Sequence, residues 1–196
     1  MTTAEQLGWQ ESSEVHGPAF VEPGKPAPRL VMFGAVPLAA ALCRAARAID
    51  WTPYVVDPRA RFASAGLFPD AELVVAAWPQ EAFAELGGID ADTSVVCLTH
   101  APELDDEALM IALRSPAPYI GALGSRRTQA RRRERLAAAG LGDAELARLS
   151  GPAGLDLGGV TASEAVLAIL AEAVAARYGR EGGRLTSSAN QIRASA

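Results

Sequence analysis

Length, composition and charge already exclude several classes of protein. The chain has 196 residues, of which 49 % are hydrophobic, and a formal net charge of −5 at pH 7. That hydrophobic content can fill one core, so a single domain is expected, and the negative charge argues against a nucleic-acid binder. The sequence shows neither a secretory leader pattern nor an apolar run of membrane-spanning length, so we expect a cytoplasmic protein without membrane partners.

A polar stretch precedes the first periodic segment. Residues 1–28 carry Pro23, Gly24, Pro26 and Pro28 near their end, and this composition predicts a flexible N-terminal tail or linker. From Arg29 onward, short apolar runs alternate with segments of helical spacing. We expect strands at 30–33, 54–56, 73–76, 95–98 and 119–120, and helices at 38–50, 79–86, 104–114, 126–139 and 143–149.

The last helix has the clearest boundaries. Thr161 and Glu164 have the spacing of a capping box, and Gly179 marks the end of the apolar stripe that follows. Residues 180–196 are expected to form a flexible C-terminal tail. Continuous apolar strands that alternate with helices predict an α/β fold over residues 29–179. We expect a Rossmann-like, doubly wound and mainly parallel sheet with helices on both faces.

The turn after the first strand matches a dinucleotide-binding fingerprint in part. Gly34 and Ala35 lie where a Rossmann domain begins its glycine-rich turn, and Asp57 ends the next strand, 23 positions after Gly34. However, Val36 replaces the second glycine, whose role is to let the backbone reach a pyrophosphate. Two interpretations therefore stand: an NAD(P) site, or a doubly wound sheet whose first turn needs only one glycine.

Thr99 and His100 directly follow the fourth predicted strand. Open α/β sheets place ligands beyond the carboxyl ends of their strands, and a histidine there can change charge near neutral pH or donate to an anion. Asp105 and Asp106 come soon after, and one could cap the next helix while the other orients the imidazole. In a purely structural interpretation, His100 satisfies a loop carbonyl and the aspartates cap the helix.

A strand–turn–helix junction provides a candidate anion cradle. Gly121 and Gly124 are followed by Ser125, Arg126 and Arg127 at the start of a predicted helix. Glycines let the backbone approach a ligand, and a helix N-terminus favours negative charge. Arg126 and Arg127 are the expected anion contacts. The arginines farther along the helix are expected to form a solvated or partner-binding face: Arg131, Arg132, Arg133 and Arg135.

The rest of the sequence offers a second glycine cluster and no catalytic constellation. Gly154 opens the cluster at residues 154–159, which leads into the last helix and gives a second candidate ligand loop. Cys43 and Cys97 lie inside apolar runs and are expected in the core. No nucleophile–base pair, carboxylate pair or metal-ligand spacing is evident, so we expect neither a catalytic residue nor a metal.

These motifs resemble the C-terminal Rossmann domain of the XdhC/CoxI family. The resemblance rests on Thr99 and His100, on residues 119–128 and on residues 152–159, and it extends over about residues 26–183. It implies an accessory protein that binds the molybdenum cofactor, a phosphate-bearing pterin. It also implies that this protein helps the sulfuration of the cofactor or its insertion into a hydroxylase of the xanthine dehydrogenase or carbon monoxide dehydrogenase type. We assign the cofactor to the candidate loops as a hypothesis.

The chain departs from the family pattern at two points. Many members carry Gly-Ala-Gly-His-Val-Ala at the first turn, where this chain has Gly34-Ala-Val-Pro-Leu-Ala39. Members usually have an additional N-terminal domain, which residues 1–28 are too short to form. The implied partners are therefore a molybdenum hydroxylase apoenzyme, together with a cysteine desulfurase or a separate N-terminal-domain protein. A homodimer is also a reasonable expectation, because symmetric dimers are the commonest oligomers.

Three functions follow as hypotheses. The first is a non-catalytic maturation chaperone, which needs a ligand site and a partner surface but no turnover machinery. The second is an NAD(P)-dependent oxidoreductase, which Val36 and the lack of an evident catalytic pair disfavour. The third is a regulatory module whose nucleotide site has decayed.

Overall fold

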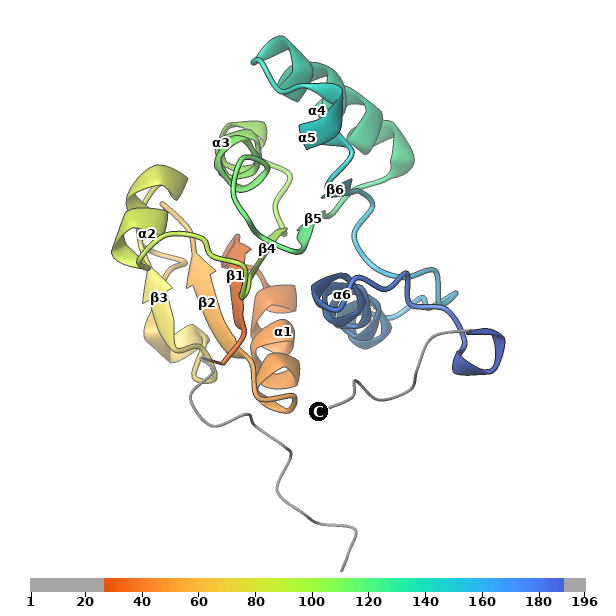
Figure 1. Cartoon of the computed structure of the whole chain (residues 1–196). Coiled ribbons are helices and arrows are strands. Elements are labelled where there is room, and N and C mark those ends of the chain that lie inside the picture. The colour runs from red at the N-terminus through yellow and green to blue at the C-terminus, as the bar shows by residue number, and fades with distance from the viewer. Residues whose placement is uncertain (1–26, 189–196) are drawn as a thin grey trace, which may run out of the picture.

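A computed structural model describes residues 27–188 of the chain. Most of the predicted N-terminal tail and the end of the predicted C-terminal tail therefore lie outside the described residues. Strands and helices alternate along the described part (Figure 1).

The strands are β1 Arg29–Phe33, β2 Thr52–Val56, β3 Leu73–Val75, β4 Thr93–Cys97, β5 Ile120–Ala122 and β6 Leu149–Ser150. The α-helices are α1 Pro37–Arg47, α2 Pro79–Glu85, α3 Pro102–Ala112, α4 Arg126–Ala138, α5 Asp143–Leu146 and α6 Ala162–Arg177. Two short 3₁₀ helices are η2 Ala65–Leu67 and η3 Leu185–Ser187.

The six strands form one sheet in the order β3-β2-β1-β4-β5-β6. Every pair of neighbours is parallel, and β1 pairs with both β2 and β4. From β1 to β3 successive strands are added toward one edge of the sheet, and from β4 to β6 toward the other. The boundary between β1 and β4 is therefore the topological switch point, where open α/β sheets bind ligands. The predicted Rossmann-like, doubly wound fold is confirmed.

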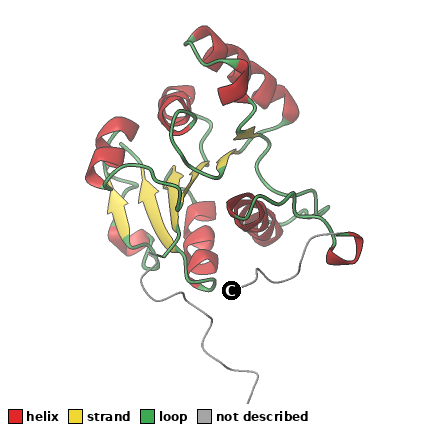
Figure 2. Ribbon diagram, in the orientation of Figure 1, coloured by secondary structure: helices red, strands yellow, loops and turns green. Residues whose placement is uncertain are grey.

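Helices cover both faces of the sheet (Figure 2). On one face, α1 and α6 pack against the side chains that β1, β2 and β4 direct toward them, among them Met32, Val55 and Val96. On the other face, α2 to α5 pack against the alternate side chains of the same strands, among them Val31 and Phe33. Burial on both faces explains why the strands are continuous apolar runs rather than alternating ones.

Helix α6 has the predicted start. The Thr161 hydroxyl accepts a hydrogen bond from Glu164 N–H at 3.2 Å, and the Glu164 carboxylate accepts one from Thr161 N–H at 2.8 Å. This reciprocal capping box satisfies donors that a helix N-terminus otherwise leaves unpaired. After Gly179, Gly182 lies against Leu155, and residues 180–188 are exposed.

Two predicted elements need correction. The helix expected at 143–149 ends at Leu146, and Leu149 begins strand β6, which pairs with β5. The reason is burial in the sheet, because Leu149 is enclosed between β5 and the helices on that face. Strand β5 also extends to Ala122, so that Gly121 lies inside the strand rather than in the turn after it.

Candidate functional site

The turn between β1 and α1 lies at the switch point and is packed against the end of β4. Gly34 has a φ of +116°, and a methyl group on it would overlap the Thr99 side chain. Only glycine combines this backbone conformation with so close an approach. Gly34 and Thr99 are both predicted site residues, and the structure places them side by side. Their contact serves packing between the ends of β1 and β4.

Asp57 is engaged within the chain. The carboxylate is fully buried and accepts hydrogen bonds from Ala35 N–H at 3.0 Å and from the backbone N–H of Arg59 at 3.0 Å. The Arg59 guanidinium adds bonds of 2.9 Å and 2.7 Å to its two oxygens. Burial alone would raise the pKa of Asp57, but these donors hold it below its ordinary value. Four donors occupy the acceptor sites of one carboxylate, so none is left for a ribose hydroxyl.

Thr99 connects the end of β4 to a buried ion pair. Its hydroxyl donates to Asp105 Oδ1 at 2.6 Å, and Asp105 Oδ2 accepts from Arg132 Nη2 at 2.9 Å. Burial raises the pKa of Asp105, although Thr99 and Arg132 oppose this shift. Arg132 also donates to the carbonyl of Leu123 at 3.0 Å and is only 2 % exposed. The arrangement ties β4, α3 and α4 together at the carboxyl edge of the sheet.

These contacts correct three predictions about charged residues. Asp105 pairs with Arg132 and Asp106 with Arg135, so neither aspartate caps α3 or orients His100 by any hydrogen bond among the described residues. Arg132 lies in the interior instead of on a solvated face. Arg133 donates to backbone carbonyls of α5 and β6, which also removes it from a partner-binding face.

The turn between β5 and α4 is held by Gln129. Its side-chain amide donates to the carbonyls of Ala122 at 2.9 Å and Leu123 at 3.1 Å. Gly124 has a φ of +127°, a conformation that requires glycine. Ser125 is the helix cap, since its hydroxyl accepts the Thr128 N–H at 3.2 Å.

Gly121 and Gly154 serve packing in this structure. A side chain on Gly121 would meet the hydroxyl and ring of Tyr119, and one on Gly154 would meet Ala168 in α6. Gly154 N–H and the Tyr119 hydroxyl both donate to Glu172 Oε2, at 2.7 Å and 2.6 Å. Packing alone therefore explains why residues 121 and 154 are glycines, without a ligand.

A cationic cavity of about 280 Å³ lies between the β4–α3 loop and helix α4. We call it the α3–α4 cavity, and its lining residues are His100, Pro102, Asp105, Arg127, Thr128, Arg131, Arg132 and Arg135. It brings the predicted residues His100 and Arg127 together, both of them exposed. Arg126 is exposed as well but does not line the cavity.

Arg131 and Arg135 were not predicted as ligand contacts, although the sequence carries a usable signal. Arg127, Arg131 and Arg135 recur every fourth residue, so they lie on one face of a helix. That face adjoins α3, and all three line the α3–α4 cavity. Helical spacing alone therefore groups Arg131 and Arg135 with Arg127.

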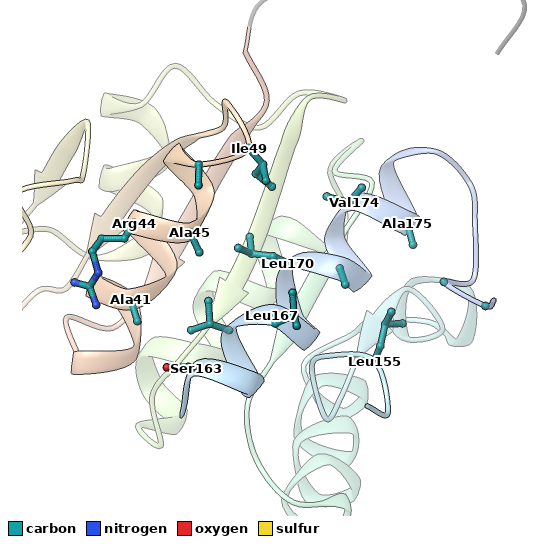
Figure 3. A pocket seen from close by; sticks show the side chains of 15 residues that line it. Ala41, Arg44, Ala45, Ile49, Leu155, Ser163, Leu167, Leu170, Val174 and Ala175 are labelled. Atoms are coloured by element: carbon teal, nitrogen blue, oxygen red, sulfur yellow. The ribbon is translucent and has the colours of Figure 1, made fainter. Parts of the chain in front are cut away.

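A second and larger hollow lies on the opposite face of the sheet, between α1 and α6 (Figure 3). This α1–α6 groove has a volume of about 790 Å³. Leu167, Leu170 and Val174 of α6 line one side, and Ala41 and Ala45 of α1, with Ile49 just after that helix, line the other. Arg44 directs its guanidinium away from α6 (Figure 3). Apart from Arg44 and Ser163, the groove is lined by alanine, leucine, isoleucine, valine and glycine.

The remaining chemistry of the described residues is sparse. Cys43 and Cys97 are buried as expected, and burial raises the pKa of Cys43 to about 11. Within residues 27–188, no three side chains of the kinds that ligate metals come together. None of the helices in that range has the length and apolar character to cross a bilayer.

Comparison with known proteins identifies the family. The profile of the XdhC Rossmann domain matches residues 30–173. The chain is 29 % identical over 158 residues to a Bacillus subtilis (strain 168) protein named as a probable xanthine dehydrogenase subunit, covering 81 % of this chain and 46 % of that protein. It is also 29 % identical over 156 residues to the "Uncharacterized protein YqeB" of Escherichia coli (strain K12), covering 80 % of this chain and 28 % of that protein.

A solved structure shares both fold and sequence with this chain. The crystal structure of a xanthine dehydrogenase from Bacillus halodurans matches with a TM-score of 0.67 and 28 % identity, over 84 % of this chain and 46 % of that one. The chain thus spans less than half the length of each of these relatives. With its six-stranded parallel sheet and the match over residues 30–173, the chain belongs to the XdhC Rossmann domain family.

Proposed function

We propose that the protein is an accessory factor for the maturation of a molybdenum hydroxylase of the xanthine dehydrogenase or carbon monoxide dehydrogenase type. In this role it binds the molybdenum cofactor and helps its sulfuration or its insertion into the apoenzyme. The family membership supports the general role. The observation that supports cofactor binding is the α3–α4 cavity, whose lining contains His100 and four arginines.

The chemistry of this edge of the sheet fits the proposed cofactor. The cofactor is a pterin that carries a phosphate, and arginine guanidinium groups are good partners for phosphate oxygens. The loop with Thr99 and His100 and helix α4 from Arg127 onward would hold it, since the cavity lies between these segments. When bound in the client enzyme, the cofactor supplies the redox-active molybdenum centre; the residues of this chain bind and orient it.

The described residues suit holding better than turnover. Thr99, Asp105 and Arg132 form a buried network whose hydrogen bonds are satisfied by one another and by the backbone of Leu123. Such a network fixes the two loops that border the cavity and leaves its members unavailable for proton transfer. We therefore propose a non-catalytic role.

An NAD(P)-dependent oxidoreductase is the second candidate, and one specific observation favours it. The strand order and the switch point between β1 and β4 are those of dinucleotide-binding domains. Against it, Asp57 is already bound by Arg59 and Ala35, and Val36 occupies the position of the glycine that admits a pyrophosphate. A regulatory module with a decayed nucleotide site is the third.

The proposal can be tested by direct binding and reconstitution. Purified protein is mixed separately with NAD(H), with NADP(H) and with molybdenum cofactor released from a donor enzyme, and bound ligand is measured after gel filtration. The expected result is retention of the cofactor and faster reconstitution of an apo-hydroxylase. Nicotinamide turnover without cofactor binding would contradict the proposal, and no binding of any of these ligands would favour the regulatory module.

The partners follow from the same proposal. The client apoenzyme is one partner, and a cysteine desulfurase or a protein that carries the remaining domain of the longer relatives is another. A homodimer is also proposed. Co-purification of the full chain with each candidate, followed by mass determination of the complex, distinguishes these assemblies.

A further inference from the structure

The α3–α4 cavity has two positive charges that no carboxylate neutralises. Of its four arginines, Arg132 pairs with Asp105 and Arg135 pairs with Asp106. The side chains of Arg127 and Arg131 form no hydrogen bond or ion pair with any of residues 27–188. Both are exposed and line the same cavity. The cavity therefore has a local excess of positive charge in a protein whose net charge is −5.

Arg132 adds an observation that is independent of surface charge. It lines the cavity, it is only 2 % exposed, and its Nε–H has no hydrogen-bond acceptor among the described residues. A buried donor without a partner is uncommon and costs free energy. The other two nitrogens of the guanidinium are fixed by Asp105, Gln129 and Leu123. The Arg132 guanidinium, one of the groups that line the cavity, is thus held rigidly and has one donor unused.

The size of the cavity limits what it can enclose. Its volume of about 280 Å³ lies below the roughly 300–1,000 Å³ of pockets that enclose a drug-sized ligand. A charged head group such as a phosphate fits this space. Two uncompensated charges match a dianion such as a phosphate or phosphate monoester better than a monoanion.

From these observations we infer that the α3–α4 cavity is a phosphate-binding subsite in which Arg127 and Arg131 supply the anion contacts and Arg132 forms the fixed wall. The inference deepens the proposed function and rests on it for the natural ligand, the phosphate of the molybdenum cofactor. Only the phosphate of that cofactor is assigned to the cavity. Binding of free phosphate depends on the cavity alone.

The test uses inorganic phosphate as the probe and the full 196-residue chain. Phosphate is titrated at low ionic strength into ¹⁵N-labelled protein, and the arginine Nε–H signals are followed by NMR. We expect a saturable shift of the Arg132 Nε–H signal. Arg131→Gln is expected to weaken binding about tenfold, the loss expected for one charge-assisted hydrogen bond. Arg126→Gln is the matched control, because it removes an equally exposed arginine that does not line the cavity.

The outcomes separate the subsite from the proposed function. An equal loss in Arg131→Gln and Arg126→Gln, or no saturable binding in the wild type, overturns the subsite even if the protein binds the molybdenum cofactor. Phosphate binding that Arg131→Gln weakens, in a protein that binds no cofactor, supports the subsite and contradicts the proposed function. If Arg131→Gln weakens phosphate binding but leaves cofactor affinity unchanged, the cofactor phosphate is not the natural ligand, and the inference is wrong on that point.

Discussion

Two hollows among the described residues lie on opposite faces of one sheet and differ in chemistry. Four arginines line the α3–α4 cavity, whereas the α1–α6 groove is lined mostly by alanine, leucine, isoleucine and valine. The difference arises from the helices and not from the sheet, because both faces of the strands are equally apolar. In this doubly wound sheet the side chains of the helices, and not those of the strands, determine the chemistry of the two hollows.

The largest expected effect concerns the buried ion pair that borders the cavity. Asp105→Ala leaves Arg132 as an uncompensated buried charge, and the expected loss in the free energy of unfolding is about 3–5 kcal/mol. Asp106→Ala is the control, because the side chain of its partner Arg135 is 41 % exposed, and a loss of about 0–1 kcal/mol is expected. Denaturant titration measures both variants. Equal losses would mean that the Asp105–Arg132 pair does not stabilise this edge.

The apolar face should respond to a change of volume and not of charge. Leu170→Ala removes a buried side chain between α1 and α6, and we expect a loss of about 2–3 kcal/mol, the lower part of the range for such truncations. The open groove beside Leu170 lets the site adjust, which limits the cost. Phosphate binding measured under native conditions should remain unchanged. A parallel loss of phosphate affinity would show that the two faces are not independent.

The Asp57–Arg59 pair at the other half of the sheet edge gives a pH-dependent prediction. The pKa of Asp57 is lowered in the folded protein, so its ionised form stabilises the fold at pH values above the ordinary aspartate pKa. That contribution disappears as the pH falls through the lowered pKa. Asp57→Asn should therefore cost about 1–2 kcal/mol at pH 7 and progressively less below about pH 4. A pH-independent difference between wild type and variant in denaturant titrations would contradict this account.

The smallest effect on stability is expected at the exposed rim of the groove. Leu167 is 60 % exposed, so Leu167→Glu should change the free energy of unfolding by no more than about 0.5 kcal/mol. The same change should lower the fluorescence of a bound apolar dye such as anilinonaphthalene sulfonate, because it places a charge in the groove. Arg131→Gln is the matched control and should leave dye binding unaltered. Similar dye signals for Leu167→Glu and the wild type would show that the dye binds elsewhere.

Much of the fold could be predicted from the sequence because its strands are buried on both faces. Runs such as residues 30–33 and 95–98 are apolar without alternation, which is characteristic of a covered parallel sheet. Strand β6 was missed because two residues carry no periodic signal and their pairing with β5 is not local. Gly121 was misplaced for a related reason: its small size makes room for Tyr119, a contact that spacing along the chain does not reveal.

The candidate site was predicted in outline but not in its charge pairing. His100 and Arg127 were both expected at the ligand edge, and the structure places them in one cavity. Arg132 was expected in solvent because isolated arginines are seldom buried, and its partner Asp105 lies on a different helix. Pairing over such sequence distances depends on how α3 packs against α4, which no local pattern encodes.

One oxygen of Glu172 has a wider consequence than its two hydrogen bonds suggest. It accepts from Tyr119 at the start of β5 and from Gly154 in the loop before α6, while α6 itself carries the carboxylate. Ala153 in the same loop donates to the carbonyl of Ala122, at the end of β5. A rotation of α6 that widened or narrowed the groove would therefore pull on both ends of β5. Glu172 thus opposes such a rotation and fixes one wall of the groove relative to β5.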